Sequence, residues 1–211
     1  MKKNYLTKVE RLQFSLSQEE KETLTGLFLG DLSAQKRSQT ENITLRFRQG
    51  TVHEAYLLHL YELFKAFCSA SPKVENSKPD KRTGKVYSAI FFNTYALPCF
   101  AELYNLFYVN GKKLIPSNIG DLLAPLGLAF WIADDGHFDD RDRVVYLSTN
   151  SFSLVEVQLL VSVLTDKFGL KCTINKNNGG FRIRIASKSL TDLQNLLKNI
   201  MPPMMLYKIG L

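Results

Sequence analysis

The stretch Leu128-Ala129-Phe130-Trp131-Ile132-Ala133-Asp134-Asp135-Gly136 is an apolar helix end that is closed by carboxylates and a glycine. An earlier stretch has the same character: Leu24-Thr25-Gly26-Leu27-Phe28-Leu29-Gly30-Asp31 is apolar and ends in one acid. The two final acids, Asp31 and Asp135, are 104 residues apart. A helix end of this kind that occurs twice predicts a chain made of two similar halves.

Both stretches carry small residues at a spacing of four. Gly26 and Gly30 share one face of the first helix, and Ala129 and Ala133 share one face of the second. Helices whose facing residues are small can approach more closely than the usual 8–10 Å between axes. We therefore expect the two helices to pack along these faces and to bring their terminal acids together.

Carboxylates at helix C-termini are electrostatically unfavourable, because that end of a helix carries partial negative charge. Two such carboxylates side by side also repel each other, unless a cation lies between them. Divalent cations held by carboxylates, backbone carbonyls and phosphate oxygens would relieve this repulsion, as in Mg²⁺ sites. We expect Asp31 and Asp135 to hold the metal, with Gly30 and Asp134 included in the site. Asp135 is preferred to Asp134 as the acid because it aligns with Asp31 and precedes Gly136.

The remaining elements repeat in the same order. Ser17, followed by Glu20, is a capping-box spacing that opens a helix over residues 18–31. Each half is predicted to be αββαββα, which gives a mixed α+β protein with two similar halves. We place the halves at residues 1–110 and 118–211, joined by a connecting segment at 111–117. The other predicted helices cover residues 52–68, 98–108, 153–168 and 189–200. Hairpins are predicted between residue 31 and the helix that starts at 52, over 73–85, from the end of the second motif to about 149, and over 171–186.

Composition excludes several classes of protein. The 211 residues are 45% hydrophobic and 22% charged, which is typical of a globular protein rather than a disordered or fibrous one. Three widely spaced cysteines do not form a disulfide scaffold, and they favour a reducing compartment. The longest apolar stretch, residues 122–133, is too short for a membrane span, and no secretory signal is visible.

The net charge of +7 is concentrated in the first half and favours a polyanionic partner. Two strand-like stretches alternate apolar and basic residues, so their arginines share one sheet face. A third basic stretch, from Lys73 to Lys85, contains turn signals and is predicted to form a long hairpin. We expect a β-ribbon surface that contacts phosphates and base edges. The candidate DNA-binding residues are Arg46, Arg48, Lys73, Lys78, Lys81, Arg82, Lys85, Arg182 and Arg184. The aromatic residues Phe91, Phe92, Tyr95 and Phe100 are expected to pack in the core.

On these motifs the sequence resembles the LAGLIDADG homing endonucleases in their single-chain, two-motif form. The resemblance extends over about residues 17–211 and includes the segments 106–116 and 204–208, which resemble the branch containing the yeast mitochondrial intron endonuclease. It implies a monomer of two pseudo-symmetric halves whose motif helices form a central interface. Each half would present a curved, four-stranded antiparallel sheet to the major groove of a long asymmetric DNA target. It also implies Mg²⁺-dependent hydrolysis of both strands that leaves short 3′ overhangs and promotes intron mobility. Mn²⁺ is expected to substitute, and Ca²⁺ to bind without supporting cleavage.

The resemblance also assigns site residues. Asp31 and Asp135 match the metal-binding catalytic aspartates, one for each strand. Lys113 and Lys208 match basic residues near the scissile phosphates, where they would stabilise developing charge or position the attacking water. Gln49, Asn150 and Asn175, on or beside strands that follow the motifs, are candidate water-network residues. The first motif departs from the family pattern in lacking the closing glycine, since Leu32 follows Asp31.

Two alternatives remain open on the same scaffold. One is an intron RNA maturase, which would bind host intron RNA as well as double-stranded DNA and would not need the acids. The other is a catalytically silent DNA-binding protein. Family habit places the protein in an organelle, either mitochondrion or chloroplast, with no membrane partner.

Overall fold

The computed structural model describes residues 5–36, 42–177 and 179–211. The chain forms two compact units. Unit 1 contains Met1–Glu20 and Asp31–Asn105, and unit 2 contains Lys21–Gly30 and Leu106–Leu211. Two helices, α2 (Gln18–Leu29) and α4 (Ala101–Phe107), therefore run from one unit into the other. The boundaries predicted at residues 110 and 118 remain a prediction.

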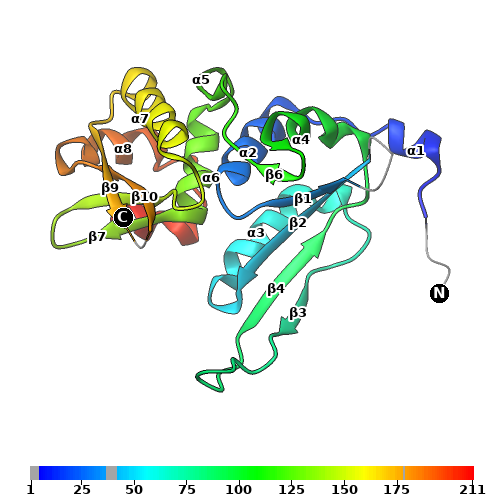
Figure 1. Ribbon diagram of the computed structural model, residues 1–211. Helices are drawn as coiled ribbons and strands as arrows, with labels where there is room; N and C mark the ends of the chain where they lie inside the picture. Colours follow the sequence, from blue (N-terminus) through cyan, green and yellow to red (C-terminus); the bar gives the residue numbers. More distant parts are fainter. Residues whose placement is uncertain (1–4, 37–41, 178) are drawn as a thin grey trace. The chain divides into compact units, whose positions relative to one another are not determined.

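Unit 1 contains a four-stranded antiparallel sheet in the order β1-β2-β4-β3. Helix α3 (Glu54–Phe64) lies along β2 and β4 on one face of this sheet (Figure 1). The other described elements are α1 (Lys8–Leu12), β1 (Ser33–Lys36), β2 (Ile43–Gly50), η1 (Thr51–His53), η2 (Lys65–Phe67), β3 (Lys73–Asn76), β4 (Ser88–Asn93) and η3 (Pro98–Phe100).

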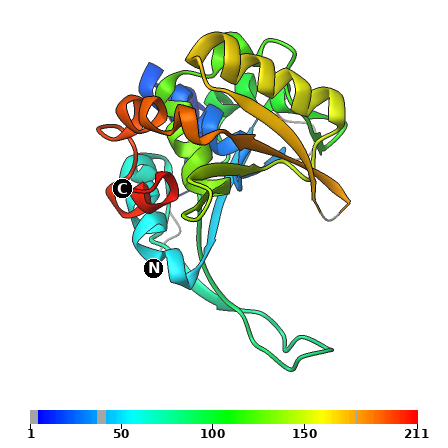
Figure 2. The same ribbon diagram turned by 90° about the vertical axis from the view of Figure 1, so that its left-hand side faces the viewer.

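Unit 2 has a second four-stranded antiparallel sheet with the matching order β7-β8-β10-β9. Helix α7 (Leu154–Phe168) lies against β9 and β10 (Figure 2), and α8 and η5 pack on α6. The remaining elements are β5 (Tyr108–Val109), β6 (Lys112–Lys113), α5 (Ile119–Leu122), α6 (Pro125–Asp135), β7 (Gly136–Asp139), β8 (Val144–Ser148), β9 (Cys172–Asn177), β10 (Gly180–Ile185), η4 (Ser187–Ser189), α8 (Leu190–Leu197) and η5 (Pro203–Ile209).

Local signals in the sequence explain several of these boundaries. Ser17 and Glu20 form the predicted capping box at the start of α2, because each side chain accepts the other residue's backbone N–H. Ser153 and Glu156 form a second capping box at α7. This helix ends at Gly169, whose φ of +68° suits glycine at a left-handed C-terminal position.

The predicted αββαββα order is confirmed in both halves of the chain, as is the α+β class. Alternation along β2 places Ile43, Leu45 and Phe47 in the core, while Arg46 and Arg48 lie on the other face. In β10, Ile183 and Ile185 are buried in the same way. The apolar sides of both sheets therefore face their helices, and the basic sides are left on the opposite faces.

Other details differ from the expectation. The basic hairpin begins at Lys73 as predicted, but its returning strand β4 begins only at Ser88, so residues 77–87 form a long loop. Asp80 fixes the turn, since its carboxylate accepts hydrogen bonds from the backbone N–H groups of Arg82 and Thr83. The loop extends past the other strands of its sheet (Figure 2).

The core prediction was wrong for Phe91, which is only half-buried on the basic face of the sheet. Strand alternation places its neighbour Phe92 in the core, where only 2% of its surface is exposed. Helices α1 and α5 and the short β5–β6 hairpin were not predicted from the sequence. Within the described residues no helix has the length and apolar character that a membrane crossing needs.

Candidate DNA-binding and cleavage site

The two motif helices approach each other closely within unit 2. A Cβ atom on Gly26 of α2 would stand 1.9 Å from the carbonyl oxygen of Gly127 in α6. One turn further, a Cβ on Gly30 would meet the Asp134 side chain at 2.6 Å. The glycine face of α2 thus lies against α6. Its partner is Gly127, which the sequence analysis did not single out, whereas Ala129 and Ala133 are fully buried.

A lysine caps the end of each motif helix. The Lys113 ammonium donates a 2.6 Å hydrogen bond to the carbonyl oxygen of Gly30, the residue before Asp31. The Lys208 ammonium donates a 2.8 Å hydrogen bond to the carbonyl oxygen of Asp134, the residue before Asp135. A cation at a helix C-terminus interacts favourably with the helix dipole and satisfies an otherwise orphaned carbonyl. The same arrangement therefore precedes both acids.

Different local structures hold these two lysines. Lys113 ends the β5–β6 hairpin, and two residues later the Ile115 backbone N–H donates to the Glu156 carboxylate at 2.9 Å. Lys208 lies in η5 and is only 8% exposed. The Gln194 side chain of α8 donates to the carbonyl of Ile209, the next residue. Packing beyond the motifs thus sets the position of each ammonium group.

The structure distributes the water-network candidates unevenly. The Gln49 amide donates a 3.0 Å hydrogen bond to a carboxylate oxygen of Asp31 in unit 1. Asn150 follows β8, and its backbone lies against Gly180. Asn175 lies in β9 opposite Arg182. Gln49 is therefore the candidate that the structure brings to an acid, and the catalytic roles of all three remain predictions.

The donor atoms around the helix ends fit a hard divalent cation. Each helix end by itself offers one carboxylate and the backbone carbonyl before it, Asp31 with Gly30 and Asp135 with Asp134, which is the oxygen-only chemistry that Mg²⁺ prefers. Each carbonyl keeps a second lone pair when it accepts from a lysine. The described residues contain no cluster of three His, Cys, Asp or Glu side chains that could hold a metal ion by itself. A cation here would therefore need further oxygens, and DNA phosphates can supply them.

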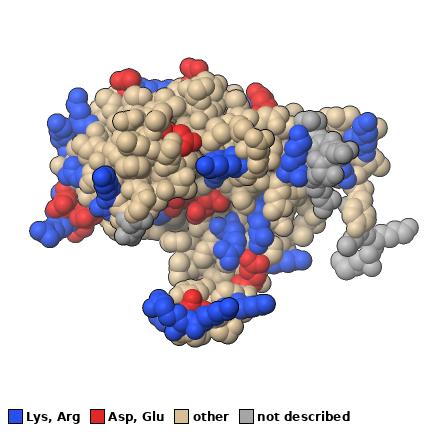
Figure 3. All heavy atoms as spheres, viewed as in Figure 1, with Lys and Arg blue, Asp and Glu red and all other residues tan. Residues whose placement is uncertain are grey.

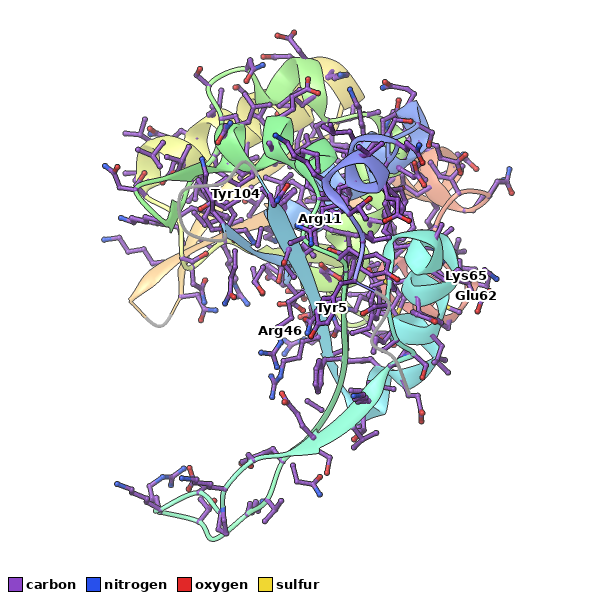
Figure 4. The ribbon with its side chains drawn as sticks, turned by 90° about the vertical axis from the view of Figure 1, so that its right-hand side faces the viewer. Tyr5, Arg11, Arg46, Glu62, Lys65 and Tyr104 are labelled. Carbon is purple, nitrogen blue, oxygen red and sulfur yellow. The ribbon has the colours of Figure 1, made fainter. Side chains whose placement is uncertain are left out.

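Three basic and acidic side chains are joined on the open face of the unit 1 sheet. One carboxylate oxygen of Glu75 accepts from Arg48 Nε at 2.8 Å and from Arg46 Nη2 at 3.0 Å. The hydrogen bond from Arg48 lowers the pKa of Glu75, so the carboxylate is charged at neutral pH. Arg46 also lies over the Phe91 ring, 4.8 Å from its centre. Figure 4 shows Arg46 on the side of the sheet away from α3 and η2, which carry Glu62 and Lys65 respectively.

This face is hollowed into a concavity of about 600 Å³. Polar and charged side chains from β1, β2 and β3 line it, together with the acid at the end of the first motif. The lining residues are Asp31, Ser33, Gln35, Arg46, Arg48, Gln49, Gly50 and Glu75. The predicted DNA-binding arginines and the predicted catalytic acid of unit 1 thus share one hollow.

The unit 2 sheet carries a related arginine–aromatic pair. The Arg182 guanidinium lies 3.8 Å from the centre of the Tyr146 ring. Arg184 is opposite Tyr146 in the strand register, so Arg182 and Arg184 lie on the open face as predicted. The Nε atoms of Arg182 and of Arg46 are both buried without a hydrogen-bond partner among the described residues. A contact of either arginine with DNA would therefore use its terminal nitrogens, one of which Arg46 already donates to Glu75.

Strand register shows that the two pairs occupy corresponding positions with their residues exchanged. Arg46 pairs with the second residue after Asp31, and Tyr146 pairs with the second residue after Asp135. Arg46 and Tyr146 therefore occupy corresponding positions. Phe91 pairs with Arg48, two residues after Arg46, and Arg182 pairs with Ser148, two residues after Tyr146. Phe91 and Arg182 therefore also correspond. In unit 1 the arginine of the pair comes from β2, whereas in unit 2 it comes from β10.

The remaining predicted DNA contacts gather in the β3–β4 hairpin. Lys73 is opposite Phe91 and so shares the open face with the arginines. The other four lie in the loop and are exposed, and Figure 3 shows a concentration of basic side chains at its tip. These four residues are Lys78, Lys81, Arg82 and Lys85.

The three cysteines take no part in this site. All are free, and burial raises the pKa of Cys68 and Cys172 to about 12 and that of Cys99 to about 11. They are protonated, unreactive thiols at neutral pH.

Sequence comparison identifies the family to which these features belong. The sequence model of the LAGLIDADG DNA endonuclease family matches residues 21–193, which include both motif helices and both sheets. The chain belongs to the LAGLIDADG DNA endonuclease family. The family resemblance drawn from the two motifs is thereby confirmed.

Two sequence relatives of this LAGLIDADG protein are named as maturases. It is 34% identical over 200 residues to the cytochrome b mRNA maturase bI2 of Debaryomyces hansenii, covering 92% of this chain and 75% of the relative. It is 32% identical over 196 residues to the Saccharomyces cerevisiae protein of that name, covering 88% of this chain but only 46% of the relative. The chain thus spans about half the length of the second protein.

The structural comparison gives an endonuclease. The homing endonuclease I-WcaI, solved bound to its DNA recognition sequence, matches with a TM-score of 0.87 at 27% identity. The match covers 94% of this chain and 89% of that one. The LAGLIDADG fold predicted from the sequence is therefore confirmed.

Proposed function

We propose that this protein is a site-specific homing endonuclease that hydrolyses both strands of a long asymmetric DNA target and promotes intron mobility. The observation that carries the proposal is the repeated helix end, in which a lysine ammonium holds the carbonyl just before an acid. Lys113, Gly30 and Asp31 form one such group, and Lys208, Asp134 and Asp135 form the other. Two strands need two such groups, and a maturase or a silent DNA-binding protein would need neither.

The residues have the following roles in this proposal. Asp31 and Asp135 orient the attacking water and supply carboxylate oxygens to Mg²⁺, for which Mn²⁺ substitutes. Bound Mg²⁺ would polarise the phosphate and stabilise the leaving oxygen. Lys113 and Lys208 stabilise the charge that develops on the phosphate oxygens. The Gln49 amide orients the Asp31 carboxylate through their hydrogen bond.

The basic sheet faces bind the DNA major groove. The arginines of β2 and β10 contact base edges, while the lysines of the β3–β4 hairpin contact phosphates. Each DNA end at the break is left with a short 3′ overhang. The protein acts as a monomer in an organelle, where introns of this kind are mobile.

The test is cleavage of intron-free organellar DNA by the purified protein, in Mg²⁺ and separately in Ca²⁺, followed by sequencing of the ends. We expect one discrete double-strand break with 3′ overhangs in Mg²⁺ and binding without cleavage in Ca²⁺. Asp31→Asn and Asp135→Asn should abolish the break. Asp166→Asn, an exposed change on α7, should leave the break intact. Binding without any break in Mg²⁺ would reject the nuclease and favour a silent DNA-binding protein.

A maturase is the second candidate, because both sequence relatives described above are named cytochrome b mRNA maturases. This role requires the scaffold and the basic surface but not the acids. Splicing of the host intron RNA that persists in the Asp31→Asn, Asp135→Asn double variant would establish it. If cleavage and splicing separate in this way, the chain carries both activities.

A further inference from the structure

Glu75 holds two arginines with a single oxygen atom. Its Oε1 accepts from Arg48 at 2.8 Å and from Arg46 at 3.0 Å. All three side chains are partly exposed, with 38% of Arg46, 51% of Arg48 and 37% of Glu75 accessible. The two ion pairs are therefore accessible to a ligand at the surface, and their contribution to folding stability is small.

The two arginines are held through different atoms. Arg48 donates its Nε to Glu75, and no described residue holds its two terminal nitrogens. Arg46 donates one terminal nitrogen to Glu75, and its Nε is buried without a partner among the described residues. Arg48 thus keeps its complete terminal fork, whereas Arg46 keeps one outward nitrogen.

This difference matters for DNA recognition. The commonest specific contact in the major groove is a bidentate one, in which an arginine fork donates to O6 and N7 of guanine. Only Arg48 of this pair can make it while both arginines remain on Glu75. Without Glu75, both flexible cations would be drawn to phosphates, whose contacts carry no base information.

We propose that Glu75 is a positioning residue that reserves Arg48 for bidentate recognition of one guanine and restrains both arginines from phosphate contacts. This inference rests on the proposed DNA-binding function. The hollow that contains Arg48 and Glu75 is also lined by Asp31 and Gln49, so the guanine lies near the phosphate cut by Asp31. Glu75 lowers affinity for DNA in general, because its charge repels phosphates, and it raises selectivity.

The test measures binding in Ca²⁺, so that cleavage does not enter. Wild-type protein is first used to select binders from duplexes with a randomised core of about 24 base pairs. Wild type, Glu75→Gln and Arg48→Lys are then measured on the selected duplex, on its complete set of single base-pair substitutions and on an unrelated duplex. Glu62→Gln is the matched control, since it also removes one negative charge and breaks a 2.6 Å ion pair, with Lys65 of η2.

We expect Glu75→Gln to bind the unrelated duplex more tightly, with a salt dependence steeper by one to two phosphate contacts. At one G·C pair its discrimination should fall by about 5- to 100-fold. Arg48→Lys keeps the charge but lacks the fork, so it should lose discrimination at that same pair. Glu62→Gln should match the wild type in its base profile and salt slope.

Two results would overturn the proposal. In one, Glu75→Gln keeps the wild-type profile at every base pair. In the other, Glu75→Gln and Arg48→Lys lose discrimination at different pairs. If wild-type protein enriches no sequence at all, the proposed function itself fails and this inference fails with it. Thermal unfolding of each variant identifies any loss that comes from misfolding.

Discussion

Gly26 of α2 and Gly127 of α6 are so close that no side chain fits between the two helices. A Cβ on Gly26 would stand 1.9 Å from the Gly127 carbonyl oxygen, far inside van der Waals contact. The obstructing atom belongs to the backbone and cannot move aside by rotation. Helix α2 therefore depends on this glycine for its place against α6.

Gly26→Ala should consequently destabilise the protein by about 2–3 kcal/mol, because the helices must separate to accept one methyl group. Denaturant unfolding measures this change. Gly120→Ala in α5 is the control, since its Cβ would meet Val163 at an ordinary 3.4 Å. The control should be neutral or stabilising by up to about 1 kcal/mol, as alanine is the better helix former. Equal effects of the two changes would argue against the close approach.

Replacing either capping lysine should impair one strand cut more than the other. Lys113→Met and Lys208→Met each remove a charged donor from one helix end, so nicked plasmid should accumulate during cleavage. Loss of one such donor slows a reaction by about 10²–10³-fold. Each change should also lower the free energy of unfolding by about 1–2 kcal/mol. Lys198→Met, which alters an exposed lysine that contacts Asn195, should produce neither effect.

The ring of Tyr146 should matter for DNA binding and its hydroxyl should not. Tyr146→Ala removes the surface that orients Arg182, and a cation–π contact is worth about 0.5–2 kcal/mol. Affinity for the specific duplex in Ca²⁺ should therefore fall by about 2- to 30-fold. Tyr146→Phe keeps the ring and should bind like the wild type. A comparable loss in both variants would mean that the hydroxyl, not the stack, carries the contact.

Glu156 should contribute stability that depends on pH. Burial raises its pKa, but hydrogen bonds from Ser153 and the Ile115 N–H outweigh this and lower the pKa overall. A depressed folded-state pKa means that the contribution is complete above the unfolded-state pKa and is lost as pH falls through the folded-state value. Glu156→Gln should lower the free energy of unfolding by about 1 kcal/mol at pH 7, because the glutamine NH₂ group would lie against a hydrogen-bond donor that now meets a carboxylate oxygen.

The difference in unfolding free energy between wild type and Glu156→Gln should shrink as pH falls below about 4.5, the ordinary pKa of a glutamate. The Glu156 carboxylate becomes protonated in this range and loses its advantage over the uncharged glutamine. Urea unfolding at several pH values measures it. Glu19→Gln, an exposed change in the first turn of α2, controls for the loss of a carboxylate. A difference that stays constant down to the acid limit would contradict the role assigned to Glu156.

Sequence alone predicted the features that depend on neighbouring residues. The capping box at Ser17 follows from residues three places apart, and the alternation in β2 and β10 follows from the period of a strand. Leu24–Asp31 and its counterpart in α6 identified the family for the same reason. These signals are local, and packing did not override them.

Features that depend on pairing between distant segments were missed. Gly127 meets Gly26 through the packing of α6 on α2, two helices about 100 residues apart in the chain, and no spacing within α6 distinguishes it from Ala129. Glu75 was overlooked because it became a partner of Arg46 and Arg48 through the register of β3 on β4. Phe91 could have been placed correctly, since the alternation that buries Phe92 assigns its neighbour to the open face.

The exchange of arginine and aromatic residue between the two sheets limits how one half can be converted into the other. Changing the Arg46–Phe91 arrangement into the Tyr146–Arg182 arrangement takes two substitutions. A first step at Phe91 would leave two arginines side by side and add a charge to the face, whereas a first step at Arg46 would leave two rings and no cation. Every single-step route therefore passes through a sheet with altered affinity for DNA. Two halves that present the same side chains to DNA at these positions would therefore require both substitutions in one half.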